Sequence, residues 1–166
     1  MKIACLGWGS LIWKPDGLPA GEWQTDAPSL PVEFARQSTD GRLTLVLLDE
    51  GQRVPVLYAI LKESDLNGGM AALAIREKCA RRRIGYWASS APAGIFAHAQ
   101  VIGNWARDRA MDAVVWTALP PKFGNVEGRV PTAEEAASYL AGLTGETRRI
   151  AKEYVCKAHA QVRTPY

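Results

Sequence analysis

The chain has 166 residues, which suits a single domain that buries roughly two thirds of its unfolded surface. Apolar residues make up 48% of the sequence and charged residues 22%, both usual for a globular protein, and the net charge of +3 is too small to indicate a nucleic-acid partner. The three cysteines form no CxxC pair, so they predict neither a disulfide framework nor a zinc site. We find no signal peptide and no membrane-spanning run, and therefore expect a cytoplasmic protein without a membrane partner.

The first half of the chain has the pattern of strands. A short apolar run at residues 2–6 is ended by Gly7, as a buried strand would be, and a loop rich in Gly, Pro and Asp follows from 14 to about 31. Asp-Gly and Glu-Gly pairs lie between the next three strand-like runs and favour hairpins. Strands this close in sequence can pair only antiparallel. The three runs cover residues 32–37, 42–48 and 54–61.

One helix and then two strands are predicted in the next part of the chain. Ser64 is the expected N-cap of a helix that continues to about Cys79. The apolar residues of this helix recur at helical spacing and form one stripe, made of Leu66, Met70 and Leu73. Strand character returns near 95–103 and is clear at 113–119.

Two helices complete the predicted order. Thr132 and Glu135 form a capping box for a helix that ends near Gly142, and a last helix covers about 146–162. Strands with one embedded helix and terminal helices predict an α+β fold, with a curved mixed or antiparallel sheet, or a small β-barrel, flanked by helices. No repeat or linker interrupts the chain, which predicts one domain over 1–166.

The glycine-rich segment CLGWGSLIW, residues 5–13, is the first candidate functional motif. It contains half of a GxGxxG fingerprint, but Ile12 occupies the last glycine position and residues 14–17 (KPDG) prevent a helix from starting there. A dinucleotide site needs that helix N-terminus under the pyrophosphate, so we exclude this reading.

Two interpretations of the motif remain. In one, a strand stops in a turn whose backbone N–H groups bind a carboxylate or an oxyanion. The donors would then be those of Trp8, Gly9, Ser10 and Leu11. In the other, the segment is a tight turn packed under tryptophan side chains and binds nothing.

Glu77 is the second candidate, because it lies on the apolar stripe of the predicted helix. A carboxylate there is costly unless paired, and burial is expected to raise its pKa toward the range that a general base needs. The alternative is a glutamate that forms an ion pair with Arg76 or Arg81, or one that reaches solvent where the helix ends.

Four stretches together resemble the gamma-glutamylcyclotransferase-like family, and its ChaC-type branch most of all. GWGSLIWKP is similar to the Tyr-Gly-Ser-Leu loop of that family, with Trp8 in place of the tyrosine. EFARQSTDGRLTLV supplies the arginine and serine that precede a turn, and IREKCARRRIGYW supplies a glutamate followed by Gly-Tyr. GETRRIAKEYVCKAHAQ is similar to the closing helix and its aromatic residue.

The resemblance implies a fold, a reaction and a site. Glu77 would be the catalytic acid and base in the cyclisation of a gamma-glutamyl compound, which releases 5-oxoproline and an amine or amino acid. The substrate class includes glutathione, gamma-glutamyl dipeptides and gamma-glutamylamines, and no metal or cofactor is implied. The implied substrate-binding residues are Gly7, Trp8, Gly9, Ser10, Leu11, Arg36, Ser38, Tyr86 and Tyr154.

Two other function classes stay open at this point. The first is a non-catalytic module that binds a small molecule in the same pocket. The second is an interaction domain that uses residues 81–83 (RRR) to bind an anionic polymer, although so short a basic run is more often a solvated turn. The sequence predicts no oligomeric state.

Overall fold

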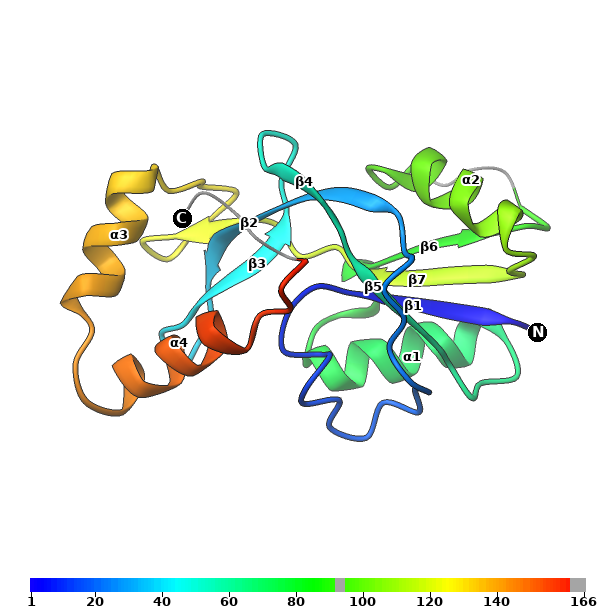
Figure 1. The fold of residues 1–166 in the computed structure, drawn as a ribbon, viewed down its shortest axis with the longest axis horizontal. Coiled ribbons are helices and arrows are strands. Elements are labelled where there is room, and N and C mark those ends of the chain that lie inside the picture. The colour runs from blue at the N-terminus through cyan, green and yellow to red at the C-terminus, as the bar shows by residue number, and fades with distance from the viewer. Residues whose placement is uncertain (92–94, 162–166) are drawn as a thin grey trace. The chain divides into compact units, whose positions relative to one another are not determined.

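The computed structural model describes residues 1–91 and 95–161 (Figure 1). Its contacts group the chain into two compact units, each assembled from three separate stretches. The first unit contains Met1–Gly7, Leu11–Ser29 and Pro55–Ala118. The second contains Trp8–Ser10, Leu30–Val54 and the chain from Leu119 onward.

The first unit is built on a four-stranded mixed sheet in the order β5-β1-β7-β6. β1 pairs antiparallel with β5 and parallel with β7, and β6 pairs antiparallel with β7. The strands expected at 2–6 and 113–119 are confirmed as β1 and β7, whereas β6 was not anticipated. The bounds are β1 Ile3–Gly7, β5 Leu57–Ile60, β6 Ile84–Ala88 and β7 Ala113–Thr117.

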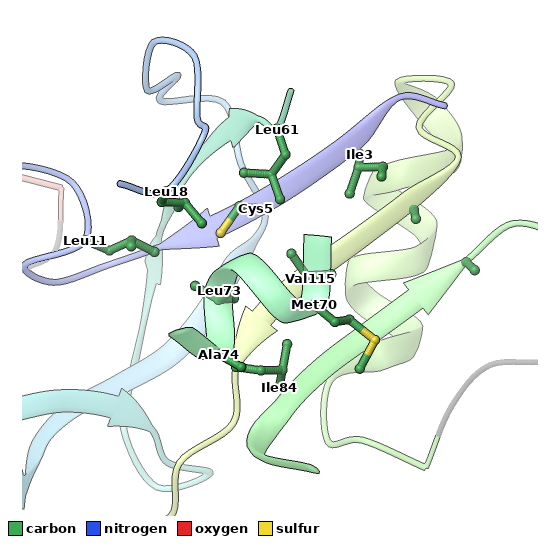
Figure 2. Close-up of a cluster of buried hydrophobic side chains, with 12 residues drawn as sticks. Ile3, Cys5, Leu11, Leu18, Leu61, Met70, Leu73, Ala74, Ile84 and Val115 are labelled. Carbon is green, nitrogen blue, oxygen red and sulfur yellow. The ribbon is translucent and has the colours of Figure 1, made fainter. Parts of the chain in front are cut away.

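Two helices cover opposite faces of this sheet (Figure 1). α1 (Leu66–Glu77) packs on the face that carries the buried cluster drawn in Figure 2. Met70 and Leu73 of the helix and Ile3 and Cys5 of β1 all belong to this cluster. α2 (Ala99–Asp108) lies on the other face, where Gly103 leaves room for the indole of Trp87.

α1 has well-defined ends. Its N-cap is Asp65, whose carboxylate accepts a hydrogen bond from the Gly68 N–H at 2.8 Å, so the expectation of Ser64 is wrong by one residue. At the other end, Lys78 adopts the left-handed conformation at φ 51°. The Cys79 N–H then reaches the Ala74 carbonyl at 3.1 Å, which is the hydrogen bond of a Schellman motif. This motif places Glu77 at the last helical turn.

The strand expected at 95–103 is wrong, because α2 occupies most of that range. The buried residues of α2 include Ala99, Ile102, Gly103 and Ala106, which recur at helical spacing, and Trp105. The Trp87 indole, which packs against α2, accounts for the glycine inside the helix.

The second unit contains another mixed sheet, in which β3, β2, β8 and β9 are successive neighbours and β4 also pairs with β2. β2 and β3 form the expected antiparallel hairpin, while β2 and β8 are parallel. The second expected hairpin is wrong, because the predicted strand at 54–61 is divided. Pro55, which lacks an N–H, ends β4, and the chain continues as β5 in the other sheet. The bounds are β2 Ser29–Gln37, β3 Leu43–Leu47, β4 Gln52–Pro55, β8 Lys122–Phe123 and β9 Val126–Glu127.

Two helices complete the second unit. α3 (Ala133–Gly142) begins with the predicted capping box, since the Glu135 N–H donates to Thr132 Oγ1 at 3.1 Å and the Thr132 N–H donates to Glu135 Oε2 at 2.9 Å. α4 (Gly145–Lys157) ends earlier than predicted, and Val162, the expected last residue, lies outside the described residues. The α+β class with mixed sheets is confirmed, and over 1–91 and 95–161 none of the helices has the length and apolar character to cross a membrane.

Lys78 makes a first prediction possible. A residue with a Cβ pays roughly 1 kcal/mol in the left-handed region, and glycine does not. Lys78→Gly is therefore expected to raise the free energy of unfolding by about 0.5–1 kcal/mol in urea titrations. Lys152→Gly, inside α4, is the control and is expected to lower it by about 1 kcal/mol. An equal loss in both variants would contradict the account of this helix end.

Candidate functional site

The end of α1 carries an unusual carboxylate. Glu77 is the last residue of the helix, and its side chain is only 18% exposed. A negative charge is disfavoured at a helix C-terminus, typically by 0.3–1 kcal/mol, and burial disfavours it further. Glu77 Oε1 accepts a hydrogen bond from Arg76 Nη1 at 3.2 Å, which is the ion pair that the sequence offered as an alternative.

Arg76 connects this carboxylate to the segment that leaves the glycine-rich motif. Its side chain is 10% exposed, and its Nη2 and Nε both donate to the Lys14 carbonyl oxygen, at 2.6 Å and 3.2 Å. Lys14 directly follows the motif in sequence. One guanidinium therefore joins the end of α1 to the downstream end of GWGSLIW, entirely within the first unit.

Cys5, at the upstream end of the motif, carries an inert thiol. Burial raises the pKa of this thiol far above the usual value, and the charge of Glu77 raises that pKa further, while Arg76 opposes the change. Cys5 is fully buried in β1, and its Sγ lies 3.6 Å from the Leu6 carbonyl oxygen. The thiol is therefore neutral and unreactive.

The glycine-rich loop is largely buried, since Trp8, Gly9 and Leu11 all have little exposed surface. The role of its backbone N–H groups as donors to a carboxylate or an oxyanion stays a prediction. Gly7 precedes these residues and leaves no room for a side chain, because a Cβ at this position would lie 2.7 Å from the Trp23 ring.

Two aromatic side chains fix the middle of the loop in the second unit. β3 is an edge strand, and the peptide groups of Leu45 point outward from it. Trp8 Nε1 donates to the Leu45 carbonyl oxygen at 3.3 Å, and the Leu45 N–H donates to the Tyr154 hydroxyl at 3.1 Å. Both aromatic residues are buried. They cap an open sheet edge, a role that the sequence did not indicate for either residue.

Arg36 and Ser38, both predicted to bind substrate, make local contacts in the second unit. Arg36 Nη1 donates to the Pro120 carbonyl oxygen at 2.8 Å, and Nη2 forms an ion pair with Glu127 at 3.3 Å. The Ser38 hydroxyl reaches the Asp40 carboxylate and the Arg42 carbonyl oxygen within the hairpin turn. These contacts stabilise β8, β9 and the turn, and a substrate role for either residue stays a prediction.

The remaining predicted residues divide between the units. Gly7, Leu11, Tyr86 and Glu77 belong to the first unit, where Leu11 and Tyr86 pack with Cys5 in the cluster of Figure 2. Trp8, Gly9, Ser10, Arg36, Ser38 and Tyr154 belong to the second. Sequence reasoning had named Arg76 only as a partner of Glu77, and its link to Lys14 carried no sequence signal.

Comparisons with known proteins give no assignment. A scan against protein-family models finds no match, and neither curated proteins nor solved structures yield one. The part of the chain that the structure describes also contains no group of three or more His, Cys, Asp or Glu side chains arranged to hold a metal ion.

The contact between Gly9 and Tyr154 provides a second prediction. A Cβ on Gly9 would collide with the Tyr154 hydroxyl, whereas the next ring atom, Cζ, would lie 3.2 Å away. Gly9→Ala should therefore destabilise the protein by about 1–3 kcal/mol through overpacking. Tyr154→Phe should cost about 1 kcal/mol through the lost hydrogen bond.

A double-mutant cycle separates the two effects. In Gly9→Ala/Tyr154→Phe the colliding hydroxyl is absent, so the double variant should lose clearly less stability than the sum of the single losses in urea unfolding. Strict additivity would show that the loop does not lie against Tyr154.

Proposed function

We propose that this protein cyclises a gamma-glutamyl compound, releasing 5-oxoproline and an amine or amino acid, with Glu77 as general base and acid. The proposal extends to a gamma-glutamylcyclotransferase-like fold and to a cytoplasmic enzyme without cofactor. The observation that carries it is the position of Glu77. A half-buried carboxylate at a helix C-terminus is held by Arg76, whose guanidinium also donates to the Lys14 carbonyl oxygen at the downstream end of the glycine-rich motif.

The position of Glu77 supports a functional role, because a negative charge at this position destabilises the helix. The carboxylate lies on an apolar stripe, at the negative end of a helix and largely out of water. Departures from local preference of this kind are expected at functional sites. Glu77 is partly buried and pairs with Arg76, so its carboxylate is held in place by the protein, as a positioned acid–base catalyst requires.

The chemistry needs a proton relay and an anion site. Glu77 takes a proton from the alpha-ammonium group of the substrate, and the freed amine attacks the gamma-carbonyl carbon of the same molecule. Glu77 then gives this proton to the leaving nitrogen as the carbon–nitrogen bond breaks. The ring nitrogen loses its second proton, which the released amine takes up to become an ammonium ion. The backbone N–H groups of the glycine-rich loop bind the alpha-carboxylate or the developing oxyanion. Because the attack is intramolecular, positioning supplies much of the rate.

Release of 5-oxoproline from a substrate panel tests the proposal. The panel contains glutathione, gamma-glutamyl dipeptides and gamma-glutamylamines. Wild type is expected to act on at least one member, and Glu77→Gln, which keeps the shape but cannot accept the proton, should lose on the order of 100-fold or more. Glu22→Gln is the matched control, because Glu22 is an exposed glutamate of the same unit.

The outcomes are distinct. Activity that falls only in Glu77→Gln supports both the reaction and its base. Near-normal activity in Glu77→Gln would refute the role of the glutamate. Saturable binding of panel members by wild type without turnover would replace the enzyme with the non-catalytic binding module.

A further inference from the structure

We propose that Arg76 is the positioning residue of this site, holding the Glu77 carboxylate and the end of the glycine-rich motif in one fixed arrangement. The inference rests on the proposed function and adds a residue to it. Among the described residues, Arg76 Nη1 donates to Glu77 Oε1, and its Nη2 and Nε donate to the Lys14 carbonyl oxygen. The residue is not assigned any contact with the substrate.

The geometry of these bonds requires a guanidinium. Its donors are held in a rigid planar fork, so a bond to Lys14 on one side fixes the direction in which Nη1 points on the other. A lysine ammonium is a single point charge on a flexible stem and cannot hold both partners in a set orientation. The low exposure of the Arg76 side chain, 10%, shows that the fork is enclosed by protein rather than spread over the surface.

The fork also constrains the glycine-rich loop. Lys14 begins the turn in which the Leu18 N–H donates to the Pro15 carbonyl oxygen at 3.0 Å. Fixing the Lys14 carbonyl group therefore fixes the start of this turn and the C-terminal end of the glycine-rich motif, which directly precedes Lys14. A shift of Arg76 would move the carboxylate and the loop relative to each other, which is the error to which positioned acid–base chemistry is most sensitive.

The kinetic signature follows from this role. Misplacing a base by about 1 Å can cost on the order of 100-fold in rate, so Arg76→Gln should lower kcat by about that factor while KM changes little. Arg76→Lys keeps the charge but not the fork, and should lose nearly as much. If only the charge mattered, the lysine variant would retain most of the activity.

The experiment compares Arg76→Lys, Arg76→Gln and the control Arg82→Gln. Arg82 is an exposed arginine of the same unit, in the 3-10 turn at Arg81–Arg83. The melting temperature of each variant is measured first. Three quantities are then measured below it: kcat and KM on the best panel substrate, and the rate of hydrogen exchange at the Leu18 amide. Wild type and Arg82→Gln should behave alike, and both Arg76 variants should show lower kcat and faster exchange at Leu18.

Every other result overturns the inference, and each assigns a different role to Arg76. A raised KM with unchanged kcat would make Arg76 a substrate-binding residue. A lowered melting temperature with unchanged kcat would make it merely structural, and full activity in Arg76→Lys would reduce its role to charge. Absence of 5-oxoproline release by wild type would defeat the proposed function itself and the positioning role with it, whereas normal Arg76 variants of an active wild type would defeat the positioning role alone.

Discussion

The guanidinium of Arg76 is the interaction on which the candidate site depends. A carboxylate at a helix C-terminus and a backbone carbonyl in a loop are both acceptors, and neither can stabilise the other without a donor between them. Arg76 supplies that donor from within the helix and brings Glu77 and Lys14 together. The ion pair also offsets the cost of a half-buried charge, since an unpaired carboxylate in this environment would be strongly disfavoured.

A second constraint acts on the loop from the edge strand β3. The N–H and carbonyl groups of Leu45 point away from β2, and side chains rather than another strand satisfy them. Trp8 therefore has a structural reason to be a tryptophan: its indole N–H is a donor at the end of a large apolar ring. Tyr154 fills the space that Gly9 leaves open, so the same contacts that close the sheet edge also fix the loop backbone.

Local signals allowed a large part of this structure to be predicted. The runs that became β1, β2, β3 and β7, the capping box at Thr132 and the stripe that leads to Glu77 depend on residues near in sequence. The pairing partners of the strands were harder to predict, because only one residue, Val56, separates β4 from β5, and the two strands pair in different sheets. α2 was missed because a glycine inside a helix is favoured only by its partner, Trp87. The link between Arg76 and Lys14 spans 62 residues, so no local pattern reveals it.

A titration with 5-oxoproline, followed by two-dimensional amide NMR of the labelled wild-type protein, tests the central claim most directly. The claim is that Glu77 and the part of the glycine-rich loop in the first unit, from Leu11 onward, serve one ligand. The amide resonances of Leu11 in the loop and of Glu77 at the end of α1 are predicted to shift together with a single Kd. Shifts confined to one of these two places, with the other unchanged at saturation, would contradict the account.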